Sequence, residues 1–233
     1  MAVPDTATQN RIFTLAARYA GNVIHQLPNF FATRETTYFE DTPSLETISP
    51  DIQNGVGLHA YVPLRVVDRS SVQVTYRDGR EVVAAAGSKG VKDSHSEHLS
   101  STGEFGPILA IVMGDALRGA VSWSHWEQGA GGPEAVLRYA VPQAKSRYKV
   151  FSACEAKAAW LTPAYHGEMA VEPATGNILR LTVVVDMPLN CQVTKVENLV
   201  EYGPVEIGGI QHICPIKSVS VSELIVSNSK ASA

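Results

Sequence analysis

The chain ends in two long extended segments separated by a diglycine, and this feature restricts the possible folds more than any other. Residues 192–207 and 210–226 carry apolar and β-branched side chains at strand-like spacing, and Gly208-Gly209 lies between them. Two consecutive glycines accept the positive φ angles that a two-residue hairpin turn requires. The pattern predicts the last hairpin of a mostly antiparallel sheet.

The preceding part of the chain repeats this arrangement. Residues 167–171 and 178–185 flank the turn sequence PATGN at 173–177 and give the clearest hairpin signal in the chain. Residues 136–141 and 146–151 are expected to form another pair of strands.

The first half of the chain has the same strand chemistry. Phe, Thr and Tyr are mixed in residues 29–39, and residues 59–67 contain the run HAYVPLRVV. Residues 71–76 alternate in SVQVTY, and a return strand at 81–86 follows the dipeptide DG at 78–79. These residues predict further antiparallel strands.

A first helix is predicted over residues 5–26. Apolar residues recur three and four positions apart, which places them on one helical face: Ile12, Leu15, Ala16, Tyr19 and Val23. Asp5 or Thr6 is a suitable N-cap, and Pro28 terminates the helical pattern.

A second, short helix is predicted within residues 104–118. Its apolar face would be formed by Phe105, Ile108, Leu109, Val112, Ala116 and Leu117. Two start points are open. Ser101 and Glu104 have the spacing of a capping box, whereas Pro107 is favoured as a first helical residue.

These elements predict an α+β fold in one domain, residues 1–233. The domain comprises a helix at 5–26, a sheet at 29–86, a loop and helix at 87–118, and a sheet at 119–226.

The net charge of −4, without a basic run, argues against nucleic-acid binding. No run of 18 apolar residues is present, so no membrane span is expected.

Three cysteines, Cys154, Cys191 and Cys214, allow at most one disulfide. Their favoured interpretation is that of buried small apolar residues, with one bridge as the alternative. The first residues lack the basic and apolar regions of a signal peptide. An exported protein whose signal peptide has been removed would start in the same way.

Four stretches resemble a group of uncharacterised exported proteins of the acidobacterial type. They are LPNFFATRETT at 27–37, SSTGEFGPIL at 100–109, YHGEMAVEPATGNILRLTVVVDMP at 165–188 and VEYGPVEIGGIQHICPIKSVSVS at 200–222. The order of elements and turns in the second half also looks like the lipoprotein-carrier superfamily of LolA, LolB and RseB-like proteins. That resemblance implies a half-barrel, in which a strongly curved antiparallel sheet carries both helices on its concave face.

The resemblance further implies a protein of the periplasm or another extracytoplasmic space that holds an apolar or amphipathic molecule, such as a lipid or acyl chain, without catalysis or a cofactor. Aromatic residues are the candidate lining of such a site, with core packing as the alternative: Phe105, Trp123, Trp126, Tyr139 and Tyr148.

The polar stretch KDSHSEHLSSTGEFG at 92–106 is interpreted as a solvated loop, but it is also the main candidate for chemistry. A hydrolase of ester or glycoside bonds would use His95, His98 and Glu104 there, together with Glu127 from the run WSHWE. His95 and His98 would share a face only on a helix, so a metal site is not expected.

The run WSHWE holds two tryptophans, Trp123 and Trp126, beside Glu127. In a regular strand the two tryptophans would lie on opposite sides of the sheet.

Three classes of function therefore remain: a binder of an apolar ligand or partner protein, favoured here; a hydrolase; and a structural module of the cell envelope.

Overall fold

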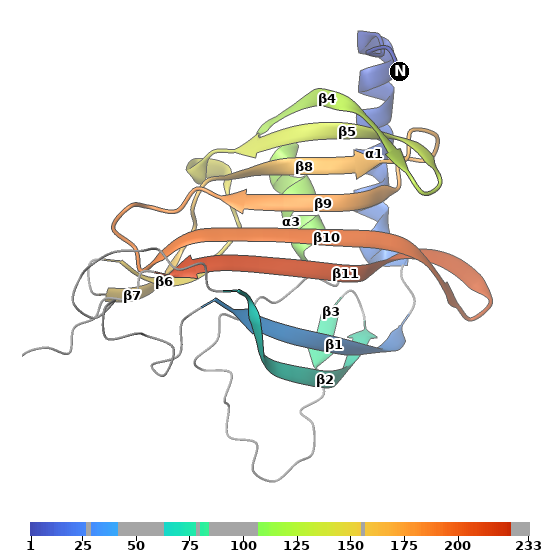
Figure 1. Ribbon diagram of the computed structural model, residues 1–233. Coiled ribbons are helices and arrows are strands. Elements are labelled where there is room, and N and C mark those ends of the chain that lie inside the picture. Colours follow the sequence, from blue (N-terminus) through green and yellow to red (C-terminus); the bar gives the residue numbers. More distant parts are fainter. Residues whose placement is uncertain (27–28, 42–62, 78–79, 84–106, 155–156, 225–233) are drawn as a thin grey trace, which may run out of the picture.

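The computed structural model describes residues 1–26, 29–41, 63–77, 80–83, 107–154 and 157–224. Figure 1 shows its helices and strands. In chain order these are α1 (Thr6–Gln26), β1 (Phe30–Glu40), β2 (Arg65–Arg77), β3 (Arg80–Val83), α3 (Pro107–Ala116), β4 (Ala120–Gly129), β5 (Gly132–Val141), the 3-10 turn η2 (Gln143–Lys145), β6 (Val150–Cys154), β7 (Lys157–Leu161), β8 (Tyr165–Val171), β9 (Ile178–Val185), β10 (Val193–Ile207) and β11 (Ile210–Leu224).

The described strands form three antiparallel sheets. The largest has six strands in the order β11-β10-β9-β8-β5-β4, the second is β1-β2-β3, and the third is the β6-β7 hairpin. The six-stranded ladder does not close on itself, because β4 and β11 are its two edges. The three-stranded sheet lies beyond the β11 edge (Figure 1). The prediction of an α+β fold with a mostly antiparallel sheet is confirmed.

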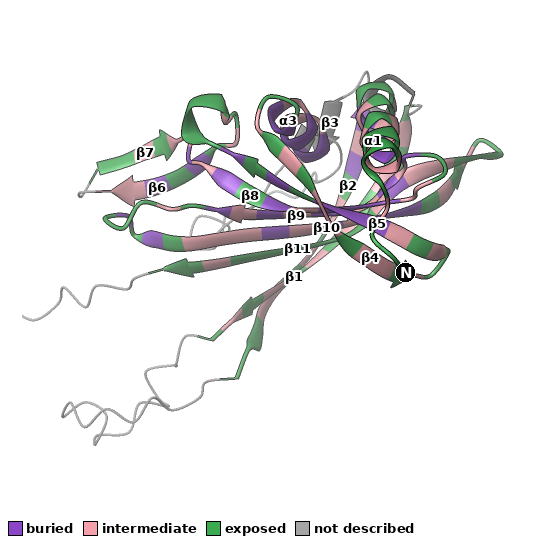
Figure 2. Ribbon diagram, turned by 90° about the horizontal axis from the view of Figure 1, so that it is seen from above, coloured by how far each residue is buried: buried purple, intermediate pink, exposed green. Residues whose placement is uncertain are grey.

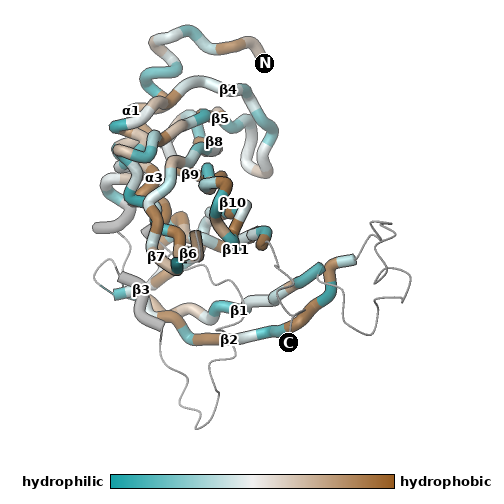
Figure 3. Tube along the Cα trace, turned by 90° about the vertical axis from the view of Figure 1, so that its left-hand side faces the viewer, coloured by the Kyte–Doolittle hydropathy of each residue, from teal (hydrophilic) through white to brown (hydrophobic). Residues whose placement is uncertain are grey.

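Both helices cover the same face of the six-stranded sheet, as the view from above shows (Figure 2). Strand positions that face the helices are fully buried, including Leu137, Met169 and Leu181. The inner face of α1 contributes Ile12 and Ala16 to the same core. Most of helix α3 is hydrophobic (Figure 3), because it is covered by α1 as well as by the sheet.

Several sequence predictions are confirmed. The hairpins β8-β9 and β10-β11 form in the expected places, and Gly208 and Gly209 have φ angles of +61° and +82°. Helix α1 begins after Asp5, whose Oδ1 accepts a hydrogen bond of 2.8 Å from the backbone N–H of Thr8. Hydrogen bonds from Thr8 lower the pKa of Asp5 below its usual value.

The second helix starts at Pro107 and ends at Ala116, within the predicted range of 104–118. Pro107 is thus its first residue, as one of the two proposed starts required. Leu117 was expected on the buried face, but it follows the last helical residue and is exposed.

One predicted strand pair is wrong. Residues 136–141 belong to β5, which is bonded to β4 on one side and β8 on the other. Both edges of β5 are occupied, so residues 146–151 cannot pair with it. They run into β6 instead, and β6 pairs with β7.

A disulfide joins Cys154 at the end of β6 to Cys191, which precedes β10. The favoured interpretation of three unpaired, buried cysteines is therefore wrong for two of them, because the fold brings these two residues together across 37 positions of sequence. Cys214 is buried and carries a free thiol.

Asp115, at the end of α3, is a completely buried carboxylate. It accepts hydrogen bonds from Arg147 Nε and Arg118 Nη2, both at 2.6 Å, and from the Arg147 backbone N–H at 2.8 Å. The Tyr165 hydroxyl on β8 donates to it at 3.0 Å. Asp115 therefore ties α3 to the segment after η2 and to the central sheet.

Candidate binding site

A pocket of about 450 Å³ that is partly open to solvent, called the cavity below, lies between the start of β1 and the turn end of the β10-β11 hairpin. Its lining comes from three segments: Asn29, Phe30, Phe31 and Ala32; Val205, Glu206, Ile207 and Gly208; Cys214 and Pro215. Most of these side chains are apolar. The size falls within the range of about 300–1,000 Å³ that is usual for small-molecule sites.

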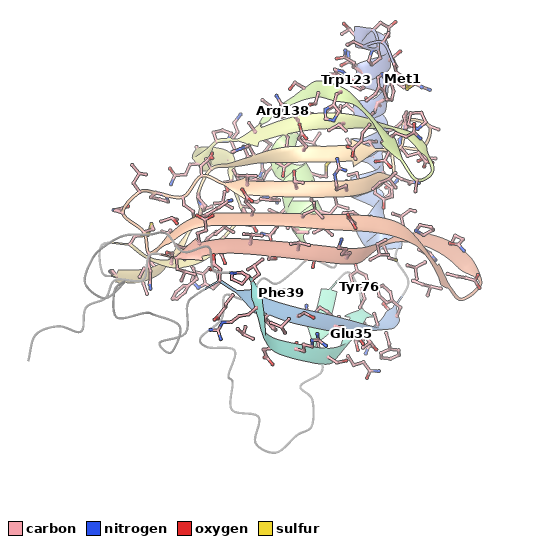
Figure 4. All side chains as sticks on the ribbon, in the orientation of Figure 1. Met1, Glu35, Phe39, Tyr76, Trp123 and Arg138 are labelled. Carbon is pink, nitrogen blue, oxygen red and sulfur yellow. A yellow bond between two sulfur atoms is a disulfide. The ribbon has the colours of Figure 1, made fainter. Side chains whose placement is uncertain are left out.

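Local strand geometry explains how these residues meet. Phe30 and Phe31 are consecutive in β1, so they point to opposite faces of the small sheet. Phe31 is 75% exposed, whereas the Phe30 ring stacks on Tyr76 of β2 with the centroids 5.3 Å apart. Tyr76 lies at the end of the small sheet nearest the C-terminal end of α1 (Figure 4). The cavity thus forms where the edge of one sheet meets the hairpin of the other.

Three buried tyrosine hydroxyls lie around this junction without a hydrogen-bond partner among the described residues: Tyr19, Tyr76 and Tyr202. Tyr76 stacks on the lining residue Phe30, and Tyr202 is the ladder partner of the lining residue Pro215. None of the three tyrosines is among the lining residues. Leaving a buried hydroxyl unpaired costs about 1–3 kcal/mol, so a hydroxyl that a polar ligand atom reached would gain a hydrogen bond.

Burial sets the charge state of these groups. It raises the pKa of Tyr19, Tyr76 and Tyr202 and also the pKa of the Cys214 thiol. All four groups are therefore neutral at physiological pH. The phenols are hydrogen-bond donors, and Cys214 lacks the thiolate that a nucleophile needs.

The four described aromatic residues that were predicted as lining lie elsewhere, in the core of the six-stranded sheet or packed against it. Tyr139 donates a hydrogen bond of 2.5 Å to the Thr182 carbonyl, and the Tyr148 hydroxyl accepts one of 2.6 Å from Asn198 Nδ2. Trp126 Nε1 donates to the Ala2 carbonyl at 2.8 Å. Phe105 lies outside the described residues. A ligand role for these aromatics stays a prediction, but other residues line the 450 Å³ cavity.

Trp123 and Trp126 share one face of the sheet, contrary to the expectation for a regular strand. The ladder pairs Trp123 with Leu137 and His125 with Val136, which leaves Ser124 as an extra residue. This bulge shifts the alternation by one position. The two indole rings consequently pack edge to face with their centroids 4.9 Å apart.

Glu127 is the one predicted catalytic residue within the described part. Arg180 Nη1 and Nη2 donate to its two oxygens at 2.8 and 2.5 Å. These bonds lower the pKa of Glu127, and the carboxylate is committed to an ion pair. Its ladder partner Glu134 has a raised pKa because it is partly buried. His95, His98 and Glu104 lie outside the described residues.

Ser124 lies beside a histidine and an acid but does not form a catalytic triad. Ser124 Oγ contacts His125 Nδ1 at 3.0 Å and donates to Glu168 Oε1 at 3.1 Å. Glu168 is also paired with Arg138 at 3.2 Å. In a triad the histidine stands between the hydroxyl and the acid, whereas here the serine does.

No cluster of three or more potential metal ligands occurs among the residues that the structure describes. Neither helix in the same part of the chain has the length and apolar character that a membrane crossing requires.

Comparisons with known proteins identify no relative: no family model, curated protein or solved structure matches the chain significantly.

None of the residues that line the cavity was predicted from the sequence as a site residue. The sequence carries two signals for them. Phe30 and Phe31 place an aromatic ring on each face of one strand, and Val205 and Ile207 alternate with polar residues just before the diglycine turn. Neither signal indicates that the two segments meet, because they are far apart in the sequence.

Proposed function

We propose that the protein binds an apolar or amphipathic small molecule, without catalysis, in the cavity between β1 and the β10-β11 hairpin. The observation that carries this proposal is the apolar lining of the 450 Å³ cavity, close to buried hydroxyls that have no partner in the part of the chain that the structure describes. The lining would hold a hydrocarbon segment, and Tyr76 or Tyr202 would donate to a polar end group.

The energetics suit an acyl chain. Each buried CH₂ group contributes about 0.8 kcal/mol, so about ten of them contribute roughly 8 kcal/mol before the cost of ordering the chain. A hydrogen bond to a previously unpaired hydroxyl adds to this, because the protein has already lost the hydration of that group.

In this proposal the two larger sheets are the walls of a LolA-like half-barrel, with α1 and α3 on its concave side. We also propose that the protein works in the periplasm or another extracytoplasmic space. The Cys154–Cys191 disulfide supports this location, because disulfides persist in oxidising compartments and are rare in the cytosol.

A binding experiment tests the proposal. Native mass spectrometry of the purified protein should reveal a co-purifying lipid, and titration calorimetry with lauric acid should give saturable binding. Ala32→Trp fills the cavity and should abolish binding, whereas Val219→Trp on the exposed part of β11 should not. Equal binding by both variants, or no binding by the wild type, would refute the proposal.

Tyr76→Phe separates a ligand role of the hydroxyl from a structural one. Removal of an unpaired buried hydroxyl should leave the ligand-free protein as stable as before or more stable. Affinity for lauric acid should nevertheless fall about tenfold, the loss expected for one hydrogen bond. Unchanged affinity would show that the polar end group binds elsewhere.

The alternative function is hydrolysis of an ester or glycoside bond. The observation in its favour is the pair Glu127 and Glu134, which face each other across β4 and β5 with pKa values displaced in opposite directions. A screen of ester and glycoside substrates tests it, with Glu127→Gln, Glu134→Gln, His98→Ala and Glu104→Ala as the variants that should lose activity.

A further inference from the structure

The β6-β7 hairpin exposes two large aromatic side chains. Phe151 and Trp160 are ladder partners whose ring centroids lie 5.4 Å apart. They are 53% and 68% exposed. The other two tryptophans of the chain, Trp123 and Trp126, are packed against the core, so Trp160 is the exposed one.

The extended segment at 147–152, which leads into this hairpin, has a buried face and an exposed face. Tyr148, Val150 and Ser152 point inward, where Tyr148 contacts the ring of Tyr165 and Val150 joins the core. The alternate residues Arg147, Lys149 and Phe151 are exposed. Basic and aromatic side chains therefore share the outer face of one extended segment.

The charge of this region is opposite to that of the whole chain. Residues 143–161 contain four basic residues and one acid, a formal charge of +3, while the chain carries −4. Arg147 is paired with Asp115. Among the described residues, none forms an ion pair with Lys149 or Lys157.

A third exposed apolar residue lies nearby. Leu189 is fully exposed and is two residues from Cys191, which the disulfide holds at the end of β6. The hairpin lies at the opposite end of the molecule from the Gly208-Gly209 turn (Figure 1).

From these exposures and charges we propose that the β6-β7 hairpin is a docking surface for an anionic lipid bilayer, formed by Phe151 and Trp160 with Lys149 on the same face. Tryptophan is favoured at the boundary between headgroups and hydrocarbon, and lysines beside it are attracted by anionic headgroups. This inference is independent of the cavity. It rests on the exposed aromatic pair and on the local excess of positive charge.

Vesicle binding tests the inference. The protein should co-sediment with vesicles of phosphatidylcholine and phosphatidylglycerol, and only weakly with phosphatidylcholine alone. Raising the salt concentration should weaken binding, because it screens the lysines. Fluorescence of Trp160 should be quenched by brominated lipid in the anionic vesicles.

Paired variants define the surface. Lys149→Gln should weaken binding about fivefold, the loss expected per basic residue near an anionic surface. Phe151→Ser with Trp160→Ser should abolish it. Ile210→Ser and Lys217→Gln make the matched changes on β11 and should bind like the wild type.

Two results would overturn the inference: equal binding to neutral and anionic vesicles, and full binding by the double serine variant. If the wild type binds no vesicles but sediments as a dimer that the double variant converts to a monomer, the surface belongs to a second copy of this chain, and the bilayer proposal is wrong.

Discussion

At the scale of single residues, the polar groups of this protein fall into two kinds. Asp115 is completely buried and has four hydrogen bonds to its two oxygens, so its burial is compensated. The hydroxyls of Tyr76 and Tyr202 are buried without such compensation among the described residues. The first kind stabilises the fold, whereas the second would gain hydrogen bonds from a ligand in the proposed site.

Asp115→Ala should destabilise the protein by about 2–3 kcal/mol, because hydrogen bonds to a charged group contribute about 1.5–3 kcal/mol and Tyr165 loses its partner. Arg118 and Arg147 are half exposed and can be hydrated instead, which limits the loss. Urea unfolding measures the change. Asp186→Ala, which breaks an exposed pair with His166, should change stability by less than about 0.5 kcal/mol. Equal effects of both variants would contradict the role assigned to Asp115.

Glu127→Gln should lower stability at neutral pH by about 1 kcal/mol or less, since the pair with Arg180 is partly exposed. The pKa of Glu127 is lowered in the folded protein, chiefly by its hydrogen bonds to Arg180. The ionised Glu127 therefore stabilises the folded protein fully at pH values above 4.5, the usual pKa of a glutamate. The stabilisation is lost as pH falls through the folded pKa.

Urea unfolding at several pH values measures this dependence. The difference in unfolding free energy between wild type and Glu127→Gln should vanish in acid. As a control, Glu35→Gln changes an exposed residue of β1 and should alter stability at neutral pH by less than about 0.5 kcal/mol. A difference in unfolding free energy that persists in acid would mean that Glu127 acts through packing.

At the scale of elements, one bulge residue and one disulfide determine where the aromatic side chains of two strands lie. The extra residue Ser124 brings Trp123 and Trp126 to one face of β4. The disulfide from Cys154 to Cys191 fastens the small β6-β7 hairpin to the segment that enters β10. A two-stranded hairpin is only marginally stable by itself, so this attachment keeps its aromatic pair in a fixed place.

Replacing Cys154 and Cys191 by serine should destabilise the protein by about 2–4 kcal/mol, because the bridge closes a long loop and restricts the unfolded chain. Urea unfolding of the double variant measures the loss. The wild type in reducing agent should unfold like the variant, and Cys214→Ser should keep the response to reducing agent. If reduction leaves the wild-type midpoint unchanged, the bridge does not form in solution.

At the scale of the whole molecule, the candidate site belongs to neither sheet alone. The β1-β2-β3 sheet supplies Phe30 and Phe31, and the six-stranded sheet supplies Val205, Ile207 and Pro215. The basic and aromatic hairpin lies at the other end of the six-stranded sheet (Figure 1). The two proposed surfaces are therefore separate, and each can be altered without changing the other.

The sequence alone determined the elements whose signals are local. The diglycine turn and the β8-β9 hairpin each depend on a few neighbouring residues, whose backbone preferences act over short range. For each helix start the sequence left two candidates, and the structure selected Asp5 and Pro107. The α+β class followed from the same signals.

Only the tertiary structure decided the features that depend on residues far apart in the chain. Strand 136–141 pairs with β4 and β8, Cys154 meets Cys191, and Phe30 and Pro215 line the same cavity. The physical reason is that alternation specifies which face of a strand is buried, but the choice of neighbouring strand depends on packing and chain connection across the whole sheet.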